Sequence, residues 1–182
     1  SLGSKSGANN GKWYGDLPKP EYVSLGDYTE GTGQPKNAGH KGAFAEVMIY
    51  GRPLNGRELG GLDRYVKAKY YGEGAVPELP TDGLRFWLDA ADLDANAETP
   101  NPADGDRIGA WVDKVTKTAL GQAEVRRQPR LARLGQAPAL YFDKSFLRGD
   151  LARGDLAEFL KALPYEDPAA AAKKAGLTKV AR

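Results

Sequence analysis

The sequence contains no cysteine, which excludes disulfide bonds, thiol catalysis and metal sites built from thiolates. Its single histidine, His40, lies in a glycine-rich stretch without a nearby serine or aspartate pattern, so neither a catalytic triad nor a zinc site is expected there. No run of residues is apolar for long enough to cross a bilayer. The formal net charge of +2 is too small to indicate a nucleic-acid partner.

The first residues, SLGSKSGANN, also lack the basic start and the apolar centre of a signal peptide. What is present is 41% hydrophobic and 27% charged residues, a composition typical of a soluble globular protein. A chain of 182 residues is long enough for one domain with a sizeable core. Because the sequence opens on what looks like the middle of a domain, we expect it to be part of a longer protein.

The strongest local signal runs from Gly42 to Gly72. Residues 44–50 alternate in polarity, which predicts a strand with one face in a core. The two expected faces are Ala45, Val47 and Ile49, and Phe44, Glu46, Met48 and Tyr50.

A helix is predicted over 56–70, directly after this strand. Asn55 is placed as its N-cap, and Glu58 three residues later completes a capping box. Gly72 supplies the left-handed stop. The apolar stripe of the helix is expected to be Leu59, Leu62, Val66 and Tyr70, and its solvent side Arg57, Asp63, Lys67 and Lys69.

This stretch resembles the closing segment of bacterial laminin-G-like, concanavalin A-like jelly-roll domains. Such domains commonly end in a G-x-x-A-E-V-x-I-Y strand, an R-x-L turn and a helix that finishes in Y-x-x-A-K-Y. The residues that match are Gly42, Ala45, Glu46, Val47, Ile49, Tyr50, Arg52, Leu54, Glu58, Tyr65, Ala68, Lys69 and Tyr70.

A second resemblance begins at Gly83, where GLRFWLDAADLD is similar to the opening strand of the same domains. WVDK at Trp111–Lys114 and PALYFD at Pro138–Asp143 are similar to the next two landmarks. The end of the domain therefore precedes its beginning. The resemblance implies that the first and last strands lie side by side, and a linker of about ten residues could join them.

We therefore predict a mostly β fold, an antiparallel jelly-roll sandwich, either partial or circularly permuted, with one packed helix at 56–70 and a helical C-terminal extension. The expected divisions are a C-terminal jelly-roll half at 1–72, a linker at 73–82, an N-terminal half at 83–150 and the extension at 151–182. A fragment that straddles two consecutive domains is the alternative to a permuted sandwich. In either case, each half leaves an apolar face uncovered, so the halves of an isolated chain must pack together.

Other strands are expected at 22–25, 84–88, 108–112 and 138–143, and Arg126–Arg133 is expected to be exposed.

An acidic loop follows the strand at 84–88. Asp92, Asp94 and Asn96 alternate as the first ligands of a calcium loop do. The EF-hand pattern then fails, since Ala97 stands where glycine is needed and Ala103 where glutamate is needed. Solvated loop acids are the alternative interpretation. Laminin-G-like sandwiches often carry a calcium ion on a loop, so the resemblance implies calcium as the candidate cofactor.

Two further groups of residues are candidate sites. Glu46 and Asp89 form a candidate carboxylate pair for glycoside hydrolysis, but the E-x-D-x-x-E strand of laminarinase-type glucanases is missing, which favours a structural acid at Glu46. Trp13, Tyr14 and Trp111, together with Tyr22, are a candidate stacking platform for a sugar, with core packing as the alternative for a strand tryptophan.

The function expected from these observations is a non-catalytic binding or adhesion module of a larger bacterial surface or secreted protein. The resemblance implies a glycan as the ligand, and an extracellular, cell-surface or periplasmic location. A structural or assembly domain that contacts neighbouring protein domains and binds nothing small is the alternative. A glycoside hydrolase is the third hypothesis, and it lacks its acids.

Overall fold

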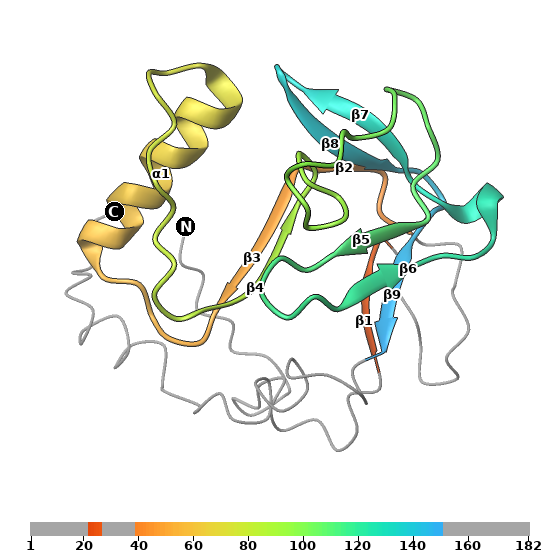
Figure 1. The fold of residues 1–182 in the computed structure, drawn as a ribbon, viewed down its shortest axis with the longest axis horizontal. Helices are drawn as coiled ribbons and strands as arrows, with labels where there is room; N and C mark the ends of the chain where they lie inside the picture. Colours follow the sequence, from red (N-terminus) through yellow and green to blue (C-terminus); the bar gives the residue numbers. More distant parts are fainter. Residues whose placement is uncertain (1–21, 27–38, 151–182) are drawn as a thin grey trace, which may run out of the picture.

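The computed structural model describes residues 22–26 and 39–150 (Figure 1). Within these ranges the fold is mostly β, with antiparallel pairing in three sheets and one α-helix. The elements are β1 (Tyr22–Leu25), β2 (Gly42–Phe44), β3 (Glu46–Tyr50), α1 (Gly56–Tyr71), β4 (Leu84–Asp89), β5 (Ala110–Val112), β6 (Ala119–Gly121), the 3₁₀ turn η2 (Val125–Arg127), β7 (Arg130–Leu134), β8 (Ala137–Phe142) and β9 (Leu147–Asp150). The predicted C-terminal extension lies outside the described residues.

The early and late parts of the chain interleave. The sheet orders are β1-β9-β6-β5, β2-β8-β7 and β3-β4. Each early strand pairs with a late one, β1 with β9, β2 with β8, and β3 with β4. The strands that the resemblance identified as closing and opening are thus direct neighbours, and Met48 lies opposite Trp87 in their register.

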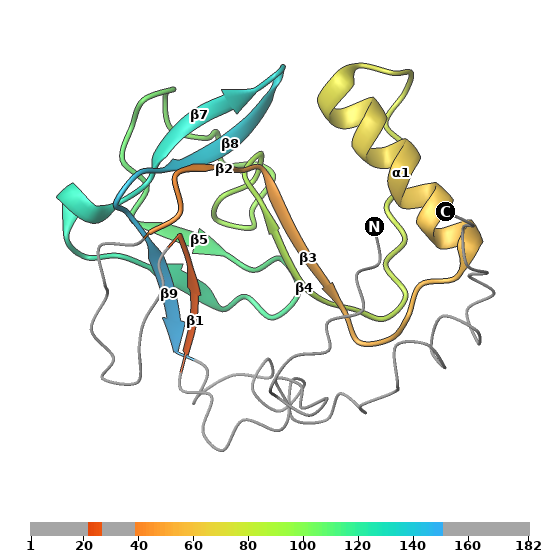
Figure 2. The same ribbon diagram turned by 180° about the vertical axis from the view of Figure 1, so that it is seen from behind.

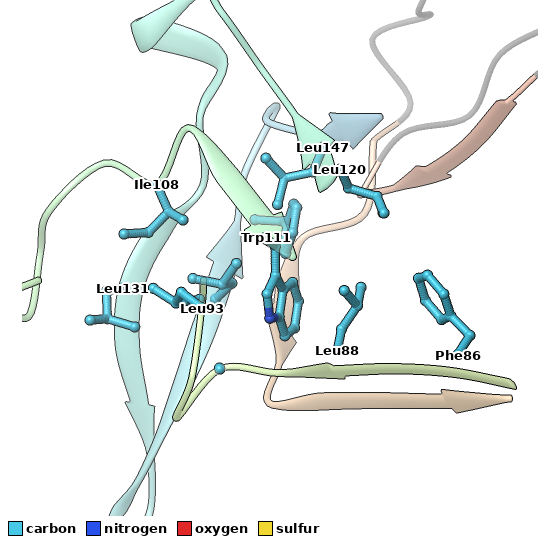
Figure 3. Close-up of a cluster of buried hydrophobic side chains, with 11 residues drawn as sticks. Phe86, Leu88, Leu93, Ile108, Trp111, Leu120, Leu131 and Leu147 are labelled. Atoms are coloured by element: carbon cyan, nitrogen blue, oxygen red, sulfur yellow. The ribbon is translucent and has the colours of Figure 1, made fainter. Parts of the chain in front are cut away.

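The β3–β4 pair separates two apolar clusters. On one face, Val47 and Ile49 pack with Phe86 and Leu88 against the main core around the fully buried Trp111 (Figure 3). On the opposite face, Met48 and Tyr50 pack with Tyr65 of α1 in a second cluster, which also holds Leu62, Val66, Leu79, Leu84 and Trp87. Figures 1 and 2 show α1 on one side of β3–β4 and the other two sheets on the opposite side.

The structure corrects the predicted face of Phe44. Ala45 interrupts the strand between β2 and β3, and its carbonyl accepts a hydrogen bond from the Ala90 amide at 2.9 Å. The chain changes sheets at this point, so the alternation does not carry across it. Phe44 consequently packs against the main core, where its ring lies 5.5 Å from that of Phe142.

Two other segments also differ from the prediction. The arginine-rich stretch at Arg126–Arg133 overlaps η2 and β7 and is not wholly exposed, because Leu131 is buried in the core while Arg130 and Arg133 stay exposed. Part of the predicted linker is packed too, since Leu79 is buried in the second cluster and the Pro80 carbonyl accepts a hydrogen bond from the Tyr50 hydroxyl at 2.7 Å. In the described part of the chain, no helix has the length and apolar character required to span a membrane.

Candidate functional site

A cluster of ionisable groups lies between α1 and the β3–β4 pair. Glu46 of β3 stands directly opposite Asp89 of β4. Helix α1 lays Tyr65 and Lys69, which are one turn apart, over these two acids. We refer to Glu46, Tyr65, Lys69, Tyr70, Trp87 and Asp89 as the polar cluster.

Glu46 is the best satisfied acid of the polar cluster. Its Oε1 accepts hydrogen bonds from the Tyr65 hydroxyl and the Trp87 indole Nε1, each at 2.8 Å. Its Oε2 accepts from the Tyr70 hydroxyl. Lys69 Nζ lies 3.0 Å from Oε1, and the Glu46 side chain is only 4% exposed. A buried carboxylate needs such donors to offset its lost hydration.

Asp89 shares the same lysine. Lys69 Nζ donates to Asp89 Oδ1 at 2.9 Å, and the Ala91 amide donates to the same oxygen. A second lysine, Lys114, lies 3.7 Å from Asp89 Oδ2 and 2.8 Å from Asp92 Oδ2. Its Nζ also lies 4.3 Å from the centroid of the Trp87 ring, a cation–π distance. Three carboxylates thus face two ammonium groups across this interface.

The two tyrosine hydroxyls of the polar cluster are held in their neutral form. Burial, then the hydrogen bond to Glu46, raises the pKa of Tyr65 and of Tyr70 well above the ordinary value. Both phenols therefore remain hydrogen-bond donors at physiological pH. They fix the helix to the carboxylate of β3 without adding charge.

The start of α1 is fastened by a second set of charges. The capping box between Asn55 and Glu58 is confirmed, with the Glu58 amide 3.0 Å from Asn55 Oδ1 and the Asn55 amide 2.8 Å from Glu58 Oε2. Arg52 binds both Glu58 oxygens, at 2.9 and 2.6 Å, and also reaches the Asp82 carboxylate. These hydrogen bonds from Arg52, followed by that from the Asn55 amide, lower the pKa of Glu58 to about 2.

This geometry bears on the candidate hydrolase pair. Glu46 and Asp89 lie under α1 and are joined through Lys69 Nζ, whereas glycoside hydrolysis needs two carboxyl groups that flank an accessible sugar. Their side chains are 4% and 8% exposed. The arrangement favours the structural role for Glu46, and it extends that role to Asp89.

The candidate sugar-binding residues are not brought together in the described part of the chain. Trp13 and Tyr14 lie outside the described residues. Trp111 is fully buried in the main core, so neither face of its ring is open to a sugar. Its position is that of core packing.

The acidic loop is held by local contacts. Asp92 is bound by Lys114, Asp94 Oδ1 accepts from the Asn96 amide at 3.0 Å, and the Asn96 side chain bonds to Thr99 and to the Glu98 amide. In residues 22–26 and 39–150, no group of three or more histidine, cysteine, aspartate or glutamate side chains is arranged to hold a metal ion. Calcium at Asp92, Asp94 and Asn96 stays a prediction.

The position of Lys69 differs from the prediction. The sequence predicts it on the solvent side of α1, but its side chain is only 15% exposed and lies between two acids. Helical phase alone could not reveal this, because a long lysine can reach back beneath the helix. The available signal was the resemblance, since Glu46, Tyr65, Lys69 and Tyr70 all belong to the matching residues and the structure places them in one contact.

Comparisons of this chain with protein-family models, with curated proteins and with solved structures found no match.

Proposed function

We propose that the chain is a non-catalytic binding or adhesion module of a larger bacterial surface or secreted protein, with a glycan as its ligand. The observation that carries the non-catalytic part is the burial of Glu46 and Asp89 around Lys69. Both acids are used to hold α1 on the sheet. The ligand class and the extracellular, cell-surface or periplasmic location rest on the resemblance alone.

The proposal includes the finer fold, a circularly permuted jelly-roll sandwich. Its support is the pairing of each early strand with a late strand, above all β3 with β4. In the resembling domains these two strands are the last and the first. A chain that connects these two strands through α1 and residues 72–83 can keep them side by side in one sandwich, although the order of the segments is reversed.

A structural or assembly role is the second candidate. It is favoured by the burial of Trp111, which removes this residue from the aromatic platform. On this alternative the chain contacts neighbouring domains and binds no small ligand.

A glycan array probed with the full chain, with and without calcium, tests the proposal. We expect saturable binding that is lost when Trp13 and Tyr14 are both replaced by alanine. Tyr71→Ala is the matched control, because Tyr71 is a 72% exposed aromatic residue outside the proposed platform. A blank array with folded protein would favour the assembly role.

The calcium hypothesis is tested in the same array. Asp94→Ala is the suitable variant, since the described contact of the Asp94 side chain is local, to the Asn96 amide, whereas Asp92 also holds Lys114. Binding that needs calcium and is lost with Asp94→Ala would support a cation on this loop. Release of reducing sugar from β-glucans, lost in folded Glu46→Gln, would overturn the non-catalytic assignment.

A further inference from the structure

Lys69 and Asp89 are placed as the two partners of an amide condensation. Lys69 Nζ is one hydrogen-bond length, 2.9 Å, from Asp89 Oδ1. Both side chains are largely shielded from water, at 15% and 8% exposed. A third group, Glu46 Oε1, lies 3.0 Å from the same nitrogen. An amino group, a carboxyl group and a proton acceptor thus meet in one largely buried interface.

We propose that Lys69 and Asp89 form an intramolecular isopeptide bond, with Glu46 as the catalytic base. Holding the two groups in contact replaces a bimolecular step with a unimolecular one, and such placement is worth an effective concentration of about 10⁵ M or more. Exclusion of water favours the amide, because water is the product that leaves. The proposal goes beyond the binding function and is independent of any ligand.

The roles of the two acids follow from their contacts. Glu46 accepts hydrogen bonds from three neutral donors, Tyr65, Tyr70 and Trp87. These donors occupy both oxygens of the Glu46 side chain. Asp89 accepts from one backbone amide, that of Ala91, in addition to Lys69, and Lys114 Nζ lies 3.7 Å from its Oδ2. We assign Asp89 as the acid that reacts, because both oxygens of Glu46 are already held by side-chain donors.

The step balances without any co-reactant. One proton of the Lys69 ammonium group moves to Asp89, which leaves an amine and a carboxylic acid. The amine lone pair forms the Nζ–Cγ bond, and Glu46 takes one proton from the nitrogen. Glu46 then returns that proton to the departing hydroxyl group as the C–O bond breaks. One water molecule leaves, and Glu46 is restored as a carboxylate.

The same interface offers an internal comparison. Lys114 Nζ lies 2.8 Å from Asp92 Oδ2, as close as the reacting pair. The ion-pair partners of Lys114 in the described part of the chain are Asp89 and Asp92, with no glutamate among them, and its side chain is 22% exposed. We therefore expect a cross-link at Lys69 and none at Lys114.

Mass spectrometry of the full chain under denaturing conditions tests the bond, because denaturation breaks an ion pair and leaves an amide intact. The expected intact mass is that of the sequence less one water molecule. Trypsin should yield a branched peptide in which residues 68–85, uncleaved at Lys69, are joined to residues 86–107. Hydroxylamine treatment must leave the mass deficit in place, since a succinimide at Asp82-Gly83 or Asp104-Gly105 would also lose water but would be opened.

Two variants complete the test. Lys69→Arg keeps the positive charge, and its intact mass should equal the mass calculated from its own sequence, with no loss of water. Folded Glu46→Gln should lose most of the cross-link. An intact wild-type chain with the full sequence mass and normal cleavage after Lys69 would overturn the proposal. A branch from residues 42–57, the tryptic peptide that contains Glu46, instead of 86–107 would overturn the assignment of Asp89 as the reacting acid.

Discussion

Lys69 shows what one residue contributes when it is buried between charges. Removing an ammonium group from water costs several kcal/mol unless partners offset it. Before the proposed amide bond forms, Glu46 and Asp89 do so, at 3.0 and 2.9 Å. Replacing either acid by a neutral residue would leave the Lys69 ammonium group with one carboxylate partner instead of two. The position of Lys69 thus ties the packing of α1 to the identity of two strand residues.

The tyrosines of the polar cluster make stability sensitive to alkaline pH. The pKa of Tyr65 and Tyr70 is raised in the folded state, by burial first and by Glu46 second, from an ordinary value of 10.0. Above pH 10 the unfolded chain therefore releases these protons while the folded chain keeps them. It follows that the stabilisation they provide is complete below pH 10 and is lost progressively as the pH rises from there toward the raised pKa of the folded state.

We expect the free energy of unfolding to fall more steeply above pH 10 in the wild-type chain than in a Tyr65→Phe/Tyr70→Phe variant. Urea unfolding at a series of pH values measures both slopes. Tyr71→Phe is the control, because this exposed tyrosine makes no contact with Glu46 that the structure describes. Equal alkaline slopes in the wild type and the double variant would contradict the role given to the two hydroxyls.

Among the elements, α1 was the most predictable. The sequence predicts residues 56–70, and the helix runs from Gly56 to Tyr71. Its ends are set by local chemistry, the capping box at Asn55 and the left-handed Gly72 with φ of 70°. Local signals of this kind are read directly from neighbouring residues.

Strands whose stability comes from distant partners were harder to predict. The prediction missed β6, β7 and β9. Strand β7 carries Arg130 and Arg133 on either side of the buried Leu131, so its composition indicates an exposed loop until its pairing with β8 is known. Likewise, the contact of Lys69 with two acids depends on the pairing of β3 with β4, which helical phase cannot supply.

The helix start gives a prediction at the same scale. Asn55→Ala removes the acceptor for the Glu58 amide and is expected to lower the free energy of unfolding by about 1 kcal/mol. Chemical denaturation measures the change. Asp63→Ala is the matched control on the same helix, because its ion pair with Lys67 is exposed and is expected to contribute less than about 0.5 kcal/mol. Equal losses in both variants would argue against the cap.

At the scale of the whole molecule, the two resembling segments lie in one body. Residues 22–50 supply β1, β2 and β3, and each pairs with a strand from residues 84–150. The sequence predicted that isolated halves must shield each other, from the apolar faces that each half exposes. The sequence did not predict the registers of the strand pairs, because a register depends on which two strands pair. The change from one sheet to another at Ala45 is an example.

The interleaving predicts that the main-chain connection between α1 and β4 is dispensable once the chain has folded. A protease site placed in the exposed residues 73–76, in a Lys69→Arg background, should be cleavable without separation of the pieces. Size-exclusion chromatography in native buffer should show one species, and denaturant should release two. Refolding of the cleaved pieces should then depend on protein concentration. Pieces that separate in native buffer would show that the strand pairs do not hold the halves together.

The pairing of β1 with β9 also bears on how the chain emerges from the ribosome. Tyr22 pairs with Asp150, so the first described strand has no partner until more than a hundred further residues have been synthesised. The same delay applies to β2 and, more briefly, to β3. During translation these segments present unpaired backbone and apolar side chains to the surrounding solution. Efficient production in a cell should therefore depend on chaperones that bind the nascent chain.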